Sequence, residues 1–484
     1  MDPRTPVIVG VGQLAPAAGE AEGPIALAVQ AVRLAAQDSG AADRLLPRAD
    51  AVGHVATLCW PYGDEAALIA AELGLTPGQT VRTAQFGGDG PALLVAEMAR
   101  AIAAGELDIA VLSGAESIAT LRALQKEGST PDWPGQDVGA TPTRQLGTNR
   151  PGNNDVELAV GVAAPVYTYA LLETALQRGD RAEHQRRIAE LWSRFSEVAA
   201  RNPHAKLRKV VGVQELLTAD AGNRPVSAPY TKLLTANADV DLATGLIMCS
   251  AKEAADAGVP RERWVFPLAA AHAHEQWFVS ERPKLAAAPA LRAVGHAALE
   301  HAGMSIDDVD HVDLYSCFPS AVQIAAAELG LSSDGRELTV TGGLTFAGGP
   351  GNNYTSHAIA TLVDRLRADP NAVGLCTAVG WYMTKHAAVV LGGHPGSSPF
   401  AVLRPETDGP APRRAAADYS GPATVEAYTV PYSRDGSPEA VIVSALAPDG
   451  TRALARSSES ELVDADDPLG RTAEISAGVV QAIS

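Results

Sequence analysis

The sequence alternates between strand-like and helix-like patterns, and it does so in two separate blocks. The first block begins with the apolar run PVIVGVG and ends with IAVLSGAES near residue 117. The second begins with LATGLIMCS and WVFPLAAAHAH and ends with AAVVLGG near residue 393. Helical patterns separate these runs, and runs that are apolar on both faces are typical of strands with helices on both sides. We therefore expect an α/β protein that repeats one βαβ-rich unit.

A glycine-rich turn occurs once in each block, between a strand pattern and a helix pattern. The two turns are Gly87–Gly90, in the sequence GGDG, and Gly348–Gly351, in the sequence GGPG. Glycine at such a place permits a tight turn, and close backbone packing alone would also explain it. Because the two turns occupy equivalent places, they support an internal duplication.

Composition changes define five segments. We expect a first half over 1–117, an insertion over 118–263, a second half over 264–395, a Pro/Arg/Ala-rich linker over 396–415 and a small β-rich domain over 416–484. The 484 residues exceed what one hydrophobic core usually organises, which agrees with several units.

Charge and hydropathy exclude several classes of protein. The formal net charge of −18 argues against general binding of nucleic acid or anionic membrane, and no run of eighteen apolar residues is present to span a bilayer. No basic and then apolar leader precedes the first strand, so we expect a cytoplasmic protein.

Cysteine and histidine do not form a recognisable metal motif. The four cysteines are far apart in sequence, which suggests neither a zinc site nor a disulfide framework. The segment AHAHEQW holds His272, His274 and Glu275 close together in sequence, but no further ligand that is separated from them in sequence is evident. We therefore predict no metal.

Several phrases together resemble the thiolases, in particular the branch of sterol-carrier-protein thiolases and thiolase-like proteins of type 1. The phrases are VIVGVGQ, GDGPALLVAEMARAIAAGELDIAVLSGAES, ARNPHAKLR, SIDDVDHVDLYSCFPS and GGLTFAGGPGNN. The resemblance spans about Pro6 to Gly393. It implies two similar halves in a five-layered αβαβα sandwich, a loop domain that receives coenzyme A as an acyl-CoA, and a monomer or homodimer. The β-rich tail would be an additional domain.

The same resemblance shows that the catalytic set of thiolases is missing. The nucleophilic cysteine corresponds to Gly87, and the histidine of the Gly-His-Pro turn corresponds to Gly349. The second cysteine corresponds to Ala378, while Cys376 stands two residues earlier. An acyl-enzyme needs a nucleophile beside a base, so ordinary ping-pong thiolysis is not expected.

Four residues remain as catalytic candidates, and three of them have a structural alternative. Tyr315 occupies the place of the family's NEAF or HDCF segment, where a phenol could transfer a proton, or it could simply hydrogen-bond a loop. Cys317 could replace the nucleophile or be an inert thiol. Asp89 could be a base at the vacated turn or a helix cap. His386 offers a group that titrates near neutral pH.

A basic stretch lies within the insertion. Residues 178–209 contain nine Lys or Arg against four Asp or Glu. The resemblance places Arg186, Arg187 and Lys206, with the turn residues Gly348 and Gly349, at the coenzyme A site. Guanidinium groups suit phosphate geometry, but a solvated amphipathic helix with glutamate partners would show the same pattern.

Three functions remain open. The first is cysteine-independent carbon–carbon bond chemistry on an acyl-CoA, of the retro-aldol type or related to it. The second is a non-catalytic acyl-CoA-binding protein, and the third is an acetyl-CoA acetyltransferase with a substitute nucleophile.

Overall fold

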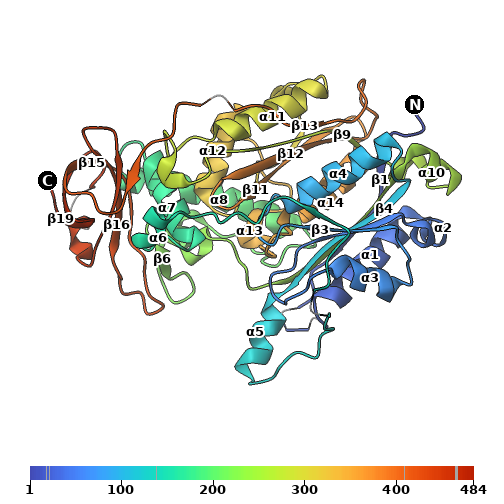
Figure 1. Cartoon of the computed structure of the whole chain (residues 1–484), viewed down its shortest axis with the longest axis horizontal. Coiled ribbons are helices and arrows are strands. Elements are labelled where there is room, and N and C mark those ends of the chain that lie inside the picture. Colours follow the sequence, from blue (N-terminus) through green and yellow to red (C-terminus); the bar gives the residue numbers. More distant parts are fainter. Residues whose placement is uncertain (18, 21, 138, 408, 464–466) are drawn as a thin grey trace.

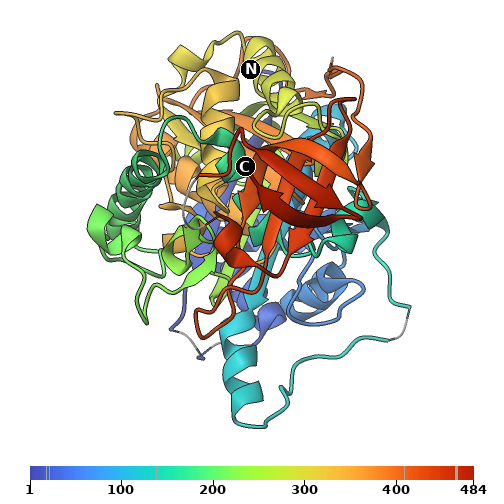
Figure 2. The ribbon, with the colours of Figure 1, turned by 90° about the vertical axis from the view of Figure 1, so that its left-hand side faces the viewer.

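Two sheets enclose a pair of central helices and carry further helices on their outer faces (Figures 1 and 2). The computed structural model describes residues 1–17, 19–20, 22–137, 139–407, 409–463 and 467–484. Parts of the predicted linker and of the predicted tail, at 408 and 464–466, lie outside these residues.

The first sheet has six strands in the order β1-β8-β4-β2-β3-β5. They are β1 Pro6–Leu14, β2 Ala51–Val55, β3 Gln79–Thr83, β4 Ile109–Ser117, β5 Arg144–Leu146 and β8 Asp241–Ser250. Strand β2 pairs in parallel with β4 and β3, and β3 pairs in parallel with β5. Strand β8 runs antiparallel to both β1 and β4. The strand β8 thus completes the first sheet, although its sequence LATGLIMCS lies within the predicted insertion over 118–263 and opens the second block of the predicted pattern. Its ten residues are all buried, so they pack in the sheet and not in a loop region.

The second sheet has five strands in the order β10-β11-β12-β9-β13. They are β9 Phe266–His274, β10 His311–Asp313, β11 Val373–Gly380, β12 Lys385–Gly392 and β13 Val402–Leu403. The predicted linker therefore contributes a short edge strand, because β13 pairs in parallel with β9.

Helices form the other three layers. The central pair is α4 Gly90–Ala104 and α14 Tyr354–Ala368, and both contact strands of the two sheets. One outer layer contains α1 Pro24–Ser39 and α3 Glu65–Leu73. The other contains α11 Pro289–His301, on which α12 Pro319–Leu329 packs. The predicted five-layered αβαβα sandwich is confirmed.

The insertion is mainly helical. It comprises α5 Ile118–Lys126, α6 Asp155–Ala159, α7 Pro165–Leu176, α8 Arg181–Arg201, α9 Val213–Leu217 and the strand pair β6 Pro225–Ser227 and β7 Tyr230–Thr231. Asp180 caps α8 by accepting the backbone N–H of Glu183. The helix buries one face that includes Trp192 and Phe195. Short helices elsewhere are α2 Ala42–Leu45, α10 Ala251–Asp256 and α13 Gly343–Phe346.

The C-terminal domain is a six-stranded sheet whose order is β14-β17-β16-β15-β18-β19. Its strands are β14 Ala415–Ala416, β15 Gly421–Thr429, β16 Val441–Leu446, β17 Arg452–Ser457, β18 Thr472–Ser476 and β19 Val479–Ile483. A further pairing of β17 with β19 closes it into a small barrel. The barrel packs against α7 at one end of the molecule (Figure 1). The predicted β-rich domain is confirmed.

Among the described residues, no helix is both long and apolar enough to cross a membrane.

Candidate functional site

The turn between β3 and α4 is the centre of the candidate site. Gly87 has φ +146°, a backbone conformation that favours glycine. Its N–H donates to Oδ1 of Asn352 over 2.9 Å, and the Asn352 amide donates to the carbonyls of Ala56 and Gln85. One side chain of the second half thus joins three backbone segments of the first half at this turn.

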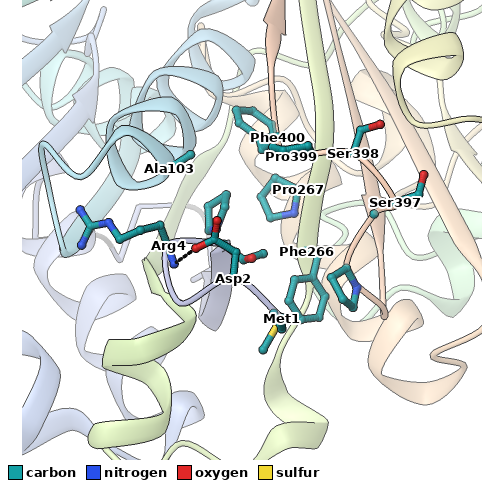
Figure 3. Close-up of a pocket in the computed structure, with 14 residues that line it drawn as sticks. Met1, Asp2, Arg4, Ala103, Phe266, Pro267, Ser397, Ser398, Pro399 and Phe400 are labelled. Carbon is teal, nitrogen blue, oxygen red and sulfur yellow. Dashed lines mark hydrogen bonds between the residues drawn. The ribbon is translucent and has the colours of Figure 1, made fainter.

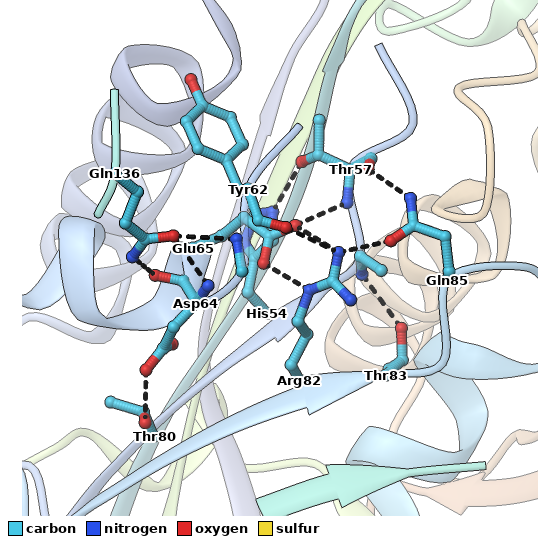
Figure 4. A network of polar contacts seen from close by, with 12 residues as sticks. His54, Thr57, Tyr62, Asp64, Glu65, Thr80, Arg82, Thr83, Gln85 and Gln136 are labelled. Atoms are coloured by element: carbon cyan, nitrogen blue, oxygen red, sulfur yellow. Dashed lines mark hydrogen bonds and ion pairs between the residues drawn. The ribbon is translucent and has the colours of Figure 1, made fainter. Parts of the chain in front are cut away.

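A buried polar network supports the strand that leads into the turn (Figure 4). Arg82 Nε lies 2.6 Å from the carboxylate of Glu65, and both side chains are buried. Arg82 also donates to the amide oxygen of Gln85 over 2.6 Å, and Gln85 donates to the carbonyl of Thr57 over 3.1 Å. Because the buried charges are paired and hydrogen-bonded, the network fixes residues 82–85 just before the turn.

A buried ion pair lies against Gly87 and Gly380. Lys385 Nζ lies 3.0 Å from Oδ1 of Asp89 and donates to the carbonyl of Phe86 over 2.7 Å. A Cβ at Gly87 would lie 2.3 Å from Lys385 Nζ, and one at Gly380 would lie 2.2 Å from Asp89 Oδ1. The two glycines therefore make room for this pair. The pair extends across two halves of the fold, since Asp89 precedes α4 and Lys385 begins β12.

Asp89 does not cap its helix. Its side chain makes no capping hydrogen bond, and among the described residues its Oδ1 has an ion pair with Lys385 but no hydrogen bond of good geometry. A buried carboxylate oxygen in this state keeps its capacity to accept a proton or a donor from a ligand.

Tyr315 approaches the same turn from the second half. A Cβ at Gly88 would lie 2.1 Å from the Tyr315 hydroxyl, and Tyr354 packs edge-on against the Tyr315 ring at 5.5 Å. Burial, followed by the nearby Cys317 and Asp89, raises the pKa of Tyr315 well above its ordinary value. The phenol therefore remains protonated near neutral pH, as a proton donor requires.

None of the four thiols is in an activating environment. Burial raises the pKa of Cys317 to about 12, and it raises the pKa values of Cys59, Cys249 and Cys376 as well. A nucleophilic cysteine needs a lowered pKa, so these surroundings favour inert thiols.

His386 is fully buried behind the ion pair. Its Nε2 bonds the carbonyl of Met383 over 3.0 Å, and burial lowers the pKa of His386 to about 3. Successive residues of a strand point to opposite faces, so Lys385 and His386 project in different directions. The imidazole stays neutral near pH 7 and does not supply the near-neutral titration expected of it.

The predicted coenzyme A residues occupy two separate places. Arg186 lies 3.8 Å from Glu190, and Arg187 lies 2.8 Å from Glu183, on the exposed face of α8. Lys206 donates to the carbonyl of Pro16 and packs near Gly348, whose added Cβ would be 3.3 Å from it.

From Arg187 to the end of α8 the helix extends about 20 Å. Among the described residues, no hydrogen bond or ion pair joins either arginine to Lys206, Gly348 or Gly349. Phosphate binding at these residues stays a prediction.

A strained turn borders the site. Trp381 and Met383 both have positive φ, at 55° and 53°. The hydroxyl of Tyr169 donates to the Trp381 carbonyl over 3.0 Å and accepts the Met383 N–H over 3.2 Å. The Trp381 ring also packs on the exposed Phe86, with centroids 5.3 Å apart. Backbone strain of this kind persists where surrounding contacts enforce it.

A cavity of about 280 Å³ between the N-terminal segment and residues 395–400 contains none of the candidate residues (Figure 3). Among the described residues that line it, Asp2 and Arg4 have charged side chains, and Arg4 is bonded to Asp108 over 2.5 Å. Within the described parts of the chain, no group of three His, Cys, Asp or Glu is placed to hold a metal ion.

The two-sheet sandwich and the C-terminal barrel define a thiolase-like protein. Residues 403–477 match the family described as thiolase-like protein type 1 additional C-terminal domain, and residues 271–351 match thiolase C-terminal domain-like. The chain aligns with the crystal structure of a monomeric SCP2-thiolase like protein type 1 from Mycobacterium smegmatis. The TM-score is 0.83 and the identity 31%, over 99% of this chain and 98% of that one. The chain therefore belongs to the SCP2-thiolase-like proteins of type 1.

A structure titled Ltp2-ChsH2(DUF35) aldolase shares the fold, with a TM-score of 0.61 and 18% identity, over 81% of this chain and 98% of that chain. Comparison with curated protein sequences finds no significant match.

Sequence reasoning missed Lys385 and Asn352. A lysine at the start of the otherwise apolar strand KHAAVVLG was an available signal, because charged residues are rarely buried without a partner. Asn352 offered no comparable signal, since its three bonds reach residues more than 260 positions away.

Proposed function

We propose that this protein cleaves or forms a carbon–carbon bond next to an acyl-CoA thioester without an acyl-cysteine. The observation that carries the proposal is the replacement of the nucleophile by the Asp89–Lys385 pair, with the Tyr315 phenol against the same turn. The raised pKa values of the thiols argue against an acetyltransferase with a substitute cysteine.

The reaction proposed is of the retro-aldol type. The proton of the hydroxyl group of a 3-hydroxyacyl thioester passes to Asp89 as the bond between C2 and C3 breaks. The electron pair moves into the thioester enolate, and Tyr315 donates its proton at C2. A carbonyl compound and a shortened acyl-CoA result, and the proton held by Asp89 returns to Tyr315 through solvent. No electron acceptor is needed.

The chemistry of the site fits these roles. A neutral phenol can donate to the thioester oxygen or to the enolate, and the nearby lysine charge favours the negative charge that develops. Some support comes from the shared fold of a protein whose title calls it an aldolase.

Turnover of a 3-hydroxyacyl-CoA tests the proposal, with the carbonyl product measured by mass spectrometry. We expect Tyr315→Phe to lower kcat by about 100-fold or more, because a proton donor in the transition state contributes at least that much. The matched control is Tyr167→Phe, which removes a phenol that is only half-buried and should retain full activity. Equal turnover by wild type and Tyr315→Phe would reject the role of Tyr315.

A second candidate function is binding of acyl-CoA without chemistry. The observation that favours it is the bond from Gly87 N–H to Asn352, which occupies a turn donor that could otherwise stabilise an oxyanion. Binding of acyl-CoA without product formation from any 3-hydroxyacyl-CoA or 3-oxoacyl-CoA would support this function over the first.

We also propose that the protein acts as a monomer. The edge of β3 is covered by β5, so that strand offers no free edge for pairing with a second copy. The related protein from Mycobacterium smegmatis is described as monomeric.

A further inference from the structure

A pocket of about 430 Å³ lies behind the ion pair, between α4, β5 and the β9–β13 edge of the second sheet. Asp89 and Lys385 form part of its wall, so the pocket reaches the candidate site. The wall includes four cationic side chains, namely Arg100, Arg144, Lys385 and Arg404.

Three of the four cations of this wall are already paired. Arg100 lies 2.7 Å from Glu97 and 2.6 Å from Glu106, and Arg144 lies 2.6 Å from Glu97. Lys385 lies 3.0 Å from Asp89. Each of these charges has a carboxylate close by, so none of them is the best anchor for an added anion.

Arg404 differs from the others because no carboxylate lies beside it among the described residues. Its Nε donates to Nε2 of His272 over 3.2 Å. Burial and then the charge of Arg404 lower the pKa of His272, so the imidazole is neutral and its nitrogen can accept. Holding Nε in this way orients the guanidinium, and its two terminal nitrogens have no hydrogen-bond partner within the part of the chain that the structure describes.

Two free terminal nitrogens of a guanidinium match the two oxygens of a carboxylate or phosphate. We propose that this pocket binds the anionic end of a small ligand, a carboxylate or phosphate group, through Arg404 oriented by His272. The inference deepens the proposed function, on which it rests for the identity of the ligand as a substrate whose other end reaches Asp89. The anion is held in a pocket that is apart from the basic face of α8.

Calorimetric titration of the full-length protein at low ionic strength tests this inference, with malonate and inorganic phosphate as separate probes. We expect saturable binding of at least one probe to wild type, and about tenfold or greater weakening in Arg404→Gln, which cannot form the charged fork. The probe that binds more tightly distinguishes a carboxylate ligand from a phosphate ligand. The matched control is Arg33→Gln, an exposed arginine of α1, which should bind like wild type.

A second variant separates the orientation of Arg404 from its charge. His272→Phe keeps the guanidinium but removes the acceptor of its Nε, and we expect weaker binding of malonate than in wild type. Absence of binding by both probes, or equal affinity in wild type and Arg404→Gln, would overturn the inference. The titration contains no acyl-CoA, so a negative result would not test the proposed role of Tyr315. Absence of turnover, in turn, would reject the proposed function and leave an anion site in place.

Discussion

At the scale of single residues, two adjacent glycines determine what the site can do. Gly87 leaves room for the Asp89–Lys385 pair, and Gly88 leaves room for the Tyr315 hydroxyl. The sequence could predict a tight glycine turn at Gly87, because a turn is a local feature. It could not predict that Lys385 fills the vacated space, because that contact joins residues 296 positions apart.

Returning a side chain to this turn should damage the protein. We expect Gly87→Ala to lower the free energy of unfolding by about 2–4 kcal/mol, because its Cβ would collide with two buried charged groups at a positive φ. Urea denaturation measures the loss. Gly128→Ala is the control, with positive φ but no atom within 4 Å of the new Cβ, and should cost about 1 kcal/mol. Equal losses in the two variants would show that the ion pair does not occupy the vacated space.

His386 should make stability depend on pH. Burial lowers the pKa of His386 from 6.5 to about 3, so the unfolded chain binds the extra proton throughout that interval. Above pH 6.5 the imidazole is neutral in both the folded and the unfolded state, so it costs no stability. As the pH drops from 6.5 toward 3, protonation of the unfolded chain lowers the free energy of unfolding.

From pH 7.5 to 4.5 we expect the free energy of unfolding of wild type to fall by about 2–3 kcal/mol more than that of His386→Gln. Denaturation series at several pH values measure this shift. A constant difference would contradict a buried neutral histidine.

At the scale of elements, the strand and helix pattern predicted both sheets, because alternating apolar runs report burial directly. The pattern misplaced β8, since strand order depends on pairings between distant segments. It also gave no sign of the strained turn at Trp381 and Met383, which is held by contacts with α7 of the insertion.

The contact between α7 and this turn can be tested through Tyr169. We expect Tyr169→Phe to lower the free energy of unfolding by about 1–3 kcal/mol, because it removes two hydrogen bonds from a buried turn. Amide exchange should increase at residues 381–384 more than in β11 or β12. Uniform exchange across all three segments would show that Tyr169 does not restrain the turn.

At the scale of the whole molecule, buried polar contacts join the C-terminal barrel to the thiolase-like part. Arg452 is fully buried, pairs with Glu426 and donates to the carbonyls of Ser280 and Arg282 over 2.9 and 2.5 Å. Thr174 of α7 donates to the carbonyl of Tyr428 over 2.8 Å and accepts its N–H. Composition alone indicated that a β-rich unit follows residue 415, but it could not show that this unit shares buried polar contacts with the insertion.

The proposed reaction needs no cysteine. The most direct measurement is the kcat/KM of a Cys317→Ala and Cys376→Ala double variant with a 3-hydroxyacyl-CoA. We predict a value within about twofold of wild type, because neither buried thiol takes part in a proton or acyl transfer. A loss of about 100-fold or more in a variant that remains folded by circular dichroism would show that a thiol is the nucleophile, and would contradict the account.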